Sequence, residues 1–575
     1  MRLFAHILSL FDAGGRRRIL GLLFLILGGA VLEAVGIGLI MPFIALISDP
    51  AYLDNQKALK WLYQASSLTT AVQFYVACAL GLLLLFLVKN AYLAVTTVVQ
   101  YRFIYAEMVT LSQRLFGAYL RGSYAFHIQH NSALLIRNIG NEVPMFFANV
   151  LTPGFILVTE GVVVLAIVAV LLWVSPGPTV LAVLFFGSVT GLFYRVVRRN
   201  VRRYGVAQQT HNGERIKWIN QGLGGIKEIK VLGREDYFIN AFSHHNAAFA
   251  EASRYAMILN QMPRLFIETI AVAAMLLGVV AVLAAGGDAQ RLLPTIALFA
   301  MASFRLLPSI NRIISSVARI AHYLPAVDVV CRDVMLALPL PSGVRSAQAE
   351  NSLVFRDRID FSNIGYTYPG AERSSLRGVS LSIPRGSSVA LVGPSGSGKT
   401  TVADILLGLL TPEQGQVLVD GRDIRENLTA WQRHLGYIPQ TIYLTDDSVR
   451  HNVAFGVPDV DIDDQAVWAA LCLAHLDDHV RSLPQGLDTV VGERGVKFSG
   501  GQRQRIGIAR ALYHDPEVLV LDEATSALDA DTERSITEAI DQLAGAKTLI
   551  IIAHRPSTIE KCGIRFELRD GKFVP

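Results

Sequence analysis

Two kinds of apolar pattern divide the chain. Long, nearly uninterrupted apolar stretches fill residues 1–325, whereas the later residues carry short apolar runs separated by charges, Gly and Pro. A bilayer core of about 30 Å needs about 20 apolar residues in a helix. Six stretches reach or approach that length, near residues 19–47, 70–98, 148–174, 178–197, 256–286 and 292–318. The pattern predicts a multidomain chain with an all-α transmembrane domain of six spans (1–325), a linker (326–352) and an α/β domain (353–575).

Basic clusters set the predicted orientation. Arg16 to Arg18 precede the first span and RVVRRNVRR (195–203) follows the fourth, which is typical of the cytosolic side of a membrane. Six crossings then leave both termini and the α/β domain in the cytosol. The long inner connections, 99–147 and 198–255, read as helical, so we expect the spans to extend beyond the membrane. Their turn-like breaks, RGSYAFHIQHNS (121–132) and NQGLGGIKE (220–228), predict short helices that touch the cytosolic domain.

Composition agrees with a membrane protein. The 575 residues are 52% hydrophobic and 17% charged, with a mean hydropathy of +0.40, which is too apolar for an ordinary soluble protein. The net charge of +5 could suggest nucleic acid, but the basic clusters flank apolar spans, so we expect a lipid bilayer and no nucleic acid as partner. Four cysteines without CxxC spacing indicate neither a disulfide framework nor a zinc site.

The α/β half contains a phosphate-binding loop. Residues 393–400 fit GxxxxGK[ST] between an apolar strand and a helix-like run, so their backbone N–H groups can surround the phosphates of ATP. Lys399 reaches the β/γ oxygens and the Thr400 hydroxyl can bind Mg²⁺. VLVLDE ends in two carboxylates, of which Asp522 would hold Mg²⁺ and Glu523 would polarise the attacking water. The predicted loop residues are Gly393, Pro394, Ser395, Gly396, Ser397, Gly398, Lys399, Thr400 and Thr401.

FSGGQRQR (498–505) lies between these two motifs, and with them the chain resembles ATP-binding cassette (ABC) proteins. Four further motifs match the family: Tyr368 its adenine-stacking aromatic, Gln440 its Q-loop, SALD (526–529) its D-loop and His554 its switch histidine. VGERG (491–495) resembles an exporter-specific loop. Phe498 replaces the commoner Leu, which indicates a packing variation. Pro556 replaces another Leu and restricts the backbone just after His554.

The resemblance implies a homodimer, because the signature of one ABC domain closes over the nucleotide of the other. The implied catalytic residues are Glu523, His554, Gln440 and Lys399, with Thr400, Gln440 and Asp522 at the Mg²⁺. Ser499 and Gly501 would bind the γ-phosphate in trans at the positive end of the following helix. The remaining implied nucleotide contacts are Gly500, Gln502 and Asp529.

Six spans ahead of the cassette resemble an exporter half-transporter of the type IV fold. Three stretches, 32–55, 262–270 and 304–316, look closest to the flippase of lipid-linked oligosaccharides in bacterial protein glycosylation, and a short amphipathic external helix within 49–67 is similar to it as well. This implies ATP-driven transfer of an anionic polyprenyl-pyrophosphate glycan to the outer leaflet of the bacterial inner membrane. The alternatives are a lipid or multidrug exporter of the same fold, and an ATP-gated channel or regulatory subunit.

Charges inside the spans suggest where such a headgroup binds. A charge at mid-membrane costs about 2.5–3.5 kcal/mol on insertion scales, so it normally faces a cavity or a partner. Lys89, Arg264, Arg305 and Arg312 are candidate phosphate ligands, with Glu268 orienting Arg264. The alternative is that Arg264 and Glu268 simply pair with each other at the interface. Two mid-span acids, Glu33 and Glu160, either neutralise some of these cations or contact a proton or sugar.

Overall fold

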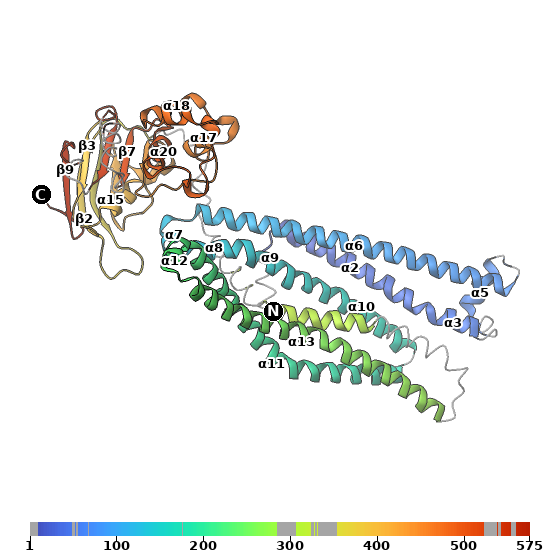
Figure 1. Ribbon diagram of the computed structural model, residues 1–575. Coiled ribbons are helices and arrows are strands. Elements are labelled where there is room, and N and C mark those ends of the chain that lie inside the picture. The colour runs from blue at the N-terminus through green and yellow to red at the C-terminus, as the bar shows by residue number, and fades with distance from the viewer. Residues whose placement is uncertain are drawn as a thin grey trace. The chain divides into compact units, whose positions relative to one another are not determined.

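The computed structural model describes residues 10–48, 52, 56–66, 68, 70–174, 176–284, 306–321, 323, 327, 331, 353–522, 538, 542–553 and 559–574. The chain divides into two compact units. The first comprises Met1–Arg121 and Ser132–Leu340, and the second comprises Gly122–Asn131 and Pro341–Pro575. Long helices form the first unit, whereas sheets and shorter helices form the second (Figure 1).

The first unit is helical. Its elements are α2 (Ala13–Gly38), α3 (Ile40–Ser48), α5 (Lys57–Ala65), α6 (Ala71–Arg121), α8 (Ser132–Arg137), α9 (Val143–Phe146), α10 (Thr152–Val174), α11 (Pro176–Gly224), α12 (Ile226–Leu232), α13 (Glu235–Ala284) and a helix over 306–321. Among the described residues, three helices are long and apolar enough to cross a membrane: Ala13–Ile47, Ala71–Arg121 and Leu134–Trp173. The fourth predicted span lies within α11. The fifth, 256–286, lies in α13 up to Ala284, and its last two residues are outside the described residues. The sixth begins in 292–305, outside the described residues.

Two π-helical segments interrupt the approach to α10. They are η1 (Asn138–Glu142) and η2 (Phe147–Leu151), and each ends two residues before a proline, Pro144 or Pro153. Proline lacks the N–H that an α-helix uses for its i→i−4 bond, and its ring crowds the preceding turn, so the helix widens there.

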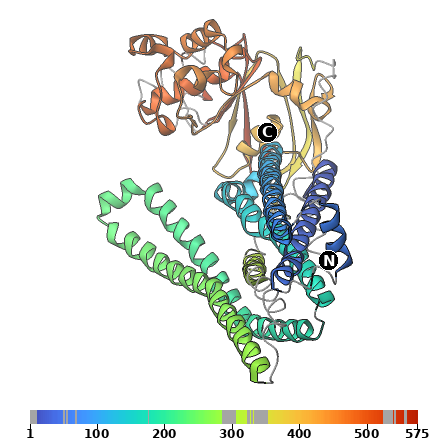
Figure 2. The same ribbon diagram turned by 90° about the vertical axis from the view of Figure 1, so that its right-hand side faces the viewer.

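Small residues bring α2 close to its neighbours. A Cβ added at Gly28 would lie 2.6 Å from the Tyr92 hydroxyl, which donates a hydrogen bond to the Leu25 carbonyl oxygen at 3.0 Å. On another side of α2, Ala30 and Ile37 pack against apolar residues of α10. α11 and α13 instead pack along each other as a hairpin with α12 at its tip, and Figure 2 shows this hairpin diverging from α2 and α6.

The second unit contains two sheets. One is antiparallel, in the order β2-β1-β4-β5, and the other has the order β10-β9-β3-β8-β7-β6 with a parallel centre. The strands are β1 (Arg358–Tyr366), β2 (Leu376–Pro384), β3 (Ser388–Val392), β4 (Gln414–Val419), β5 (Arg422–Asp423), β6 (Leu435–Ile438), β7 (Val518–Asp522), β8 (Thr548–Ile552), β9 (Ile564–Arg569) and β10 (Lys572–Val574). β7 and β8 are buried along their whole length, which explains their continuous apolar sequences.

Helices of the second unit surround these sheets. They are α7 (Tyr124–Gln129), α15 (Lys399–Leu406), α16 (Leu428–Arg433), α17 (Val449–Val453), α18 (Asp464–Leu473), α19 (Asp477–Ser482) and α20 (Gly500–Leu512). Both predicted breaks form short helices, α7 and α12. α7 begins at the Ser123 cap, and Ala125 packs against the core that the antiparallel sheet shares with β3. The prediction that 121–132 forms a helix is confirmed, and this helix packs with the α/β unit.

Candidate functional site

The strand order of the larger sheet brings the predicted nucleotide motifs to one edge. β3, β8, β7 and β6 are neighbours and run parallel, so their carboxyl ends lie side by side. The phosphate-binding loop follows β3, position 554 follows β8, Asp522 ends β7 and Gln440 follows β6. Ligands of open parallel sheets bind at this edge, outside the carboxyl ends of the strands.

Glycine is required in the phosphate-binding loop for two reasons. Gly393 has φ +147° and Gly398 has φ +106°, which other residues rarely adopt. A Cβ at Gly398 would also lie 2.8 Å from the Ser375 carbonyl oxygen, so the loop packs too closely for a side chain. Between these glycines, Pro394, Ser395 and Gly396 are exposed, which leaves the turn of the loop open to a ligand.

The side chains around this loop suit phosphate. Lys399 is buried, and its Nζ donates to the carbonyl oxygens of Gly393 and Pro394 at 2.9 and 3.0 Å, so the ammonium is held over the loop. The Ser397 hydroxyl is buried and has no hydrogen-bond partner within the described part of the chain, as expected of a group that meets a ligand. Thr400 is exposed at the start of α15.

Tyr368 lies beside the same helix. Its hydroxyl is 3.3 Å from the Thr401 hydroxyl, and its ring makes an edge-on contact with Tyr366 at 5.1 Å between centroids. The ring is half-buried at the border of the core, so part of it remains exposed, as stacking on a planar base requires.

Two acids lie together at the end of β7. Asp522 is buried, and Asp404 of α15 is buried near it. Burial, with a further contribution from the charge of Asp522, raises the pKa of Asp404 to about 6. A divalent cation at Asp522 would relieve this repulsion. Its predicted partners, the Thr400 hydroxyl and the exposed Gln440, supply the oxygen ligands that Mg²⁺ prefers.

The signature motif begins α20. Ser499 is the N-cap: its hydroxyl accepts from the Gln502 N–H at 3.3 Å, and the Gln502 side chain accepts from the Ser499 N–H at 2.9 Å. This capping box fixes the first turn, whose N–H groups carry the positive end of the helix dipole. Ser499 and Gly500 are exposed. Phe498 is buried, with its ring 6.0 Å from His479, which agrees with a packing variation.

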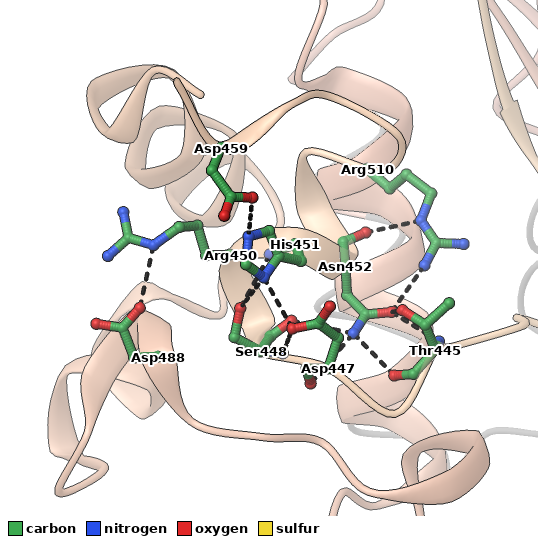
Figure 3. Close-up of polar contacts among 9 residues, drawn as sticks. All are labelled: Thr445, Asp447, Ser448, Arg450, His451, Asn452, Asp459, Asp488 and Arg510. Atoms are coloured by element: carbon green, nitrogen blue, oxygen red, sulfur yellow. Dashed lines mark hydrogen bonds and ion pairs between the residues drawn. The ribbon is translucent and has the colours of Figure 1, made fainter. Parts of the chain in front are cut away.

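Figure 3 shows a polar network that the sequence analysis missed. Arg510 of α20 donates from Nε to the Asn452 carbonyl oxygen and from Nη1 to the Tyr443 carbonyl oxygen, both at 2.8 Å. Asn452, fully buried, donates to the Thr445 carbonyl oxygen at 3.1 Å. The network ties the segment after Gln440 to the signature helix. In the sequence, this network was indicated only by a charged residue, Arg510, within the apolar run IGIARAL.

Figure 3 also shows the polar contacts of His451. Its ring nitrogens lie 2.8 Å from an Asp447 oxygen and 2.9 Å from an Asp459 oxygen. The hydrogen bond to Asp447, and then that to Asp459, raise the pKa of His451. The ring therefore joins α17 to the turn at Asp459 through both nitrogens.

Several predicted residues lie outside this description. Glu523, Asp529, His554 and Arg305 fall outside the described residues, as does the side chain of Arg264, whereas Glu268 is exposed on α13. The short helix predicted within 49–67 is present as α5, whose Tyr63 ring contacts Phe74 edge-on at 5.1 Å, and its external position stays a prediction.

Two predicted headgroup ligands form ion pairs with the mid-span acids. Lys89 Nζ is 3.5 Å from Glu33, and both side chains are buried. Arg312 Nε is 2.6 Å from Glu160, which is buried, whereas 45% of the Arg312 side chain is exposed. Neutralisation by Glu33 and Glu160, left open by the sequence, is therefore confirmed for these two cations.

Both halves of the chain match known families. Residues 19–306 match "ABC transporter transmembrane region" and residues 376–526 match "ABC transporter". A protein of Cupriavidus pinatubonensis described as "ATP-dependent lipid A-core flippase" is 32% identical over 81% of this chain and 78% of its own length. One of Bordetella avium with the same description is 34% identical over 73% and 70%.

A solved structure shares the fold. It is described as a bacterial Atm1-family ABC exporter with ATP bound, and it superposes with a TM-score of 0.77 over 98% of this chain and 95% of its own, at 24% identity.

Proposed function

Because this chain belongs to the ABC transporter family and carries both its transmembrane region and its ATPase domain, ATP hydrolysis drives transport across a membrane, and we propose that the cargo is an anionic lipid-linked oligosaccharide. The fold is the type IV exporter fold. The glycan headgroup would pass from the cytosolic to the outer leaflet of a bacterial inner membrane. Arg312, a half-exposed cation inside a predicted span, carries this proposal.

The residues that follow the parallel strands are assigned their roles in ATP hydrolysis by their positions at the strand ends. Backbone N–H groups of Gly393 and of residues 395–398, with the Lys399 ammonium, would bind the β/γ phosphates. Thr400, Gln440 and Asp522 would hold Mg²⁺, which supplies positive charge against the phosphates when bound. Glu523 follows the last residue of β7, where its carboxylate would orient and polarise the attacking water. His554, just beyond β8, would contact the γ-phosphate from the same edge.

In this proposal the functional transporter is a homodimer. α12 at the hairpin tip exposes Ile226, Val231 and Leu232, with exposed fractions of 47, 79 and 68%. Such apolar exposure at the end of a cytosolic extension favours a covering partner. Ser499 and Gly501 at the open end of α20 would meet nucleotide held by the other protomer.

A different lipid is the second candidate cargo. The relatives that match both halves are described as lipid A-core flippases, which favours a lipid exporter of the same fold. A multidrug exporter would have fewer charges in its spans, and an ATP-gated channel or regulatory subunit would not need Glu523.

The test is leaflet transfer in proteoliposomes. Full-length protein is reconstituted with a fluorescent polyprenyl-diphosphate oligosaccharide, with a lipid A-type glycolipid in a parallel preparation. We expect ATP-dependent transfer of the first lipid, and Glu523→Gln should abolish transfer while ATP still binds. Transfer of the second lipid alone would select the lipid A-type cargo. An ATPase-active wild type that moves neither lipid would refute the proposed cargo class.

A further inference from the structure

Two cation–carboxylate pairs lie within the predicted spans, and they differ in access. Glu33 with Lys89 joins α2 to α6, and Glu160 with Arg312 joins α10 to the helix over 306–321. Both acids are buried. The cations differ, because 7% of the Lys89 side chain is exposed and 45% of the Arg312 side chain.

The Lys89 pair is enclosed. Its ammonium lies 3.5 Å from Glu33 and 4.3 Å from the centre of the Phe86 ring, so a carboxylate and an aromatic face share the charge. Gly36 lies beside the stem, because a Cβ there would be in ordinary contact with Lys89 Cδ at 3.8 Å. A headgroup cannot reach this ammonium without parting α2 from α6. Lys89 is therefore a packing cation of the α2–α6 interface.

The Arg312 pair is open on one side. Glu160 engages the Nε edge at 2.6 Å, and the Arg312 side chain makes no other hydrogen bond within the described residues. The terminal nitrogens of the guanidinium remain available as donors. A charged group in a span avoids hydrocarbon, so this edge faces the interior of the proposed dimer rather than lipid tails.

We propose that Glu160 is a positioning residue, which holds the Arg312 guanidinium so that its outer edge takes a phosphate oxygen of the transported lipid headgroup. A guanidinium is a flat fork whose donors lie in fixed directions, so one short bond through Nε sets the plane of the others. The outer edge then offers parallel N–H donors to phosphate, as bidentate recognition requires. The buried carboxylate also offsets the charge of Arg312 between transport events.

This inference rests on the proposed function, because it assumes a phosphorylated headgroup. The phosphate can belong to a polyprenyl diphosphate or to a lipid A-type glycolipid, and both are used as probes below. The competing role is purely structural, in which the pair only ties α10 to the last helix. The two roles predict different effects on lipid transfer when the two charges are exchanged.

The experiment compares two charge exchanges in full-length protein in proteoliposomes. Glu160→Arg with Arg312→Glu keeps an ion pair but places the carboxylate at the exposed position. Glu33→Lys with Lys89→Glu is the matched control inside the α2–α6 core. Leaflet transfer is measured against probe concentration for both phosphorylated lipids and for a neutral glycolipid, together with basal ATPase activity and thermal unfolding.

We expect the 160/312 exchange to keep the unfolding temperature but to lose transfer of the phosphorylated probe that wild type moves. The 33/89 exchange should keep transfer. Glu160→Gln should raise the apparent KM about tenfold, as expected for the loss of a charge-assisted hydrogen bond, and Glu160→Asp should restore part of it. Transfer of the neutral glycolipid, if wild type moves it, should not change.

A wild-type KM in the 160/312 exchange or in Glu160→Gln would overturn the positioning role. If the exchange fails to fold, Arg312→Lys decides, because it keeps the charge but lacks the fork: a wild-type KM there would overturn the proposal. An absence of transfer in wild type would instead refute the proposed function, so the two failures are distinguishable.

Discussion

Gly398 illustrates how a single residue shapes the nucleotide loop. Its φ of +106° and the nearby Ser375 carbonyl oxygen leave no room for a Cβ, whereas Gly396 has φ +78° with open space around it. Gly396→Ala should therefore lower the free energy of unfolding only by the strain of a left-handed backbone, about 1–2 kcal/mol. Gly398→Ala should lower the free energy of unfolding further and should weaken ATP binding at least tenfold. Nucleotide titration and thermal unfolding of both variants check this, and equal effects would contradict it.

His451 should make stability depend on pH. The carboxylates of Asp447 and Asp459 raise its pKa in the folded state, so the protonated form is stabilised relative to the unfolded chain. This contribution is complete below the unfolded pKa of about 6.5 and is lost as pH rises through the higher folded value. Unfolding temperatures of wild type and His451→Gln should differ more at about pH 6 than at about pH 9. A difference independent of pH would contradict the assignment.

At the scale of elements, Arg510 connects the signature helix to the segment after Gln440. It donates to two backbone carbonyls and to the Asn452 side chain, the last at 3.1 Å. Lysine cannot reproduce this fork, so Arg510→Lys should lower the free energy of unfolding by about 1–3 kcal/mol. Arg505 of the same helix donates to a single carbonyl, that of His475, and Arg505→Lys is the control. Chemical denaturation measures both, and equal losses would refute the role of the fork.

At the scale of the whole molecule, the composite nucleotide site can be tested by mixing subunits. Lys399→Ala and Gly501→Asp should each inactivate a homodimer. A dimer with one change in each subunit keeps one intact site, because the unchanged loop of one protomer meets the unchanged signature of the other. Co-assembly should therefore restore ATPase activity.

The control for this mixture is wild type co-assembled with a double variant carrying both changes. In that heterodimer each nucleotide site contains one changed residue. The activity of this mixture should therefore come only from wild-type homodimers. With random assembly of equal amounts, about half of the dimers in the first mixture carry one intact site and about a quarter of those in the control carry two, so we expect similar activities. An inactive first mixture beside an active control would contradict sites shared in trans.

Local pattern was sufficient for much of the fold. Apolar length located the helices α2, α6 and α10, and the break at 121–132 predicted α7. The boundaries 1–325, 326–352 and 353–575 remain predictions. The pairing of α11 with α13 was not predicted, because their contact depends on which faces meet across residues far apart in the chain.

The sequence by itself determined the family, the order of the nucleotide motifs and the existence of cations in the spans, because each depends on residue types at short spacing. Tertiary structure decided what those cations do. Glu160 and Arg312 are 152 positions apart, and no local pattern distinguishes their open pair from the enclosed pair of Glu33 and Lys89. The difference arises from packing: α2 and α6 close around Lys89, whereas one edge of Arg312 remains accessible.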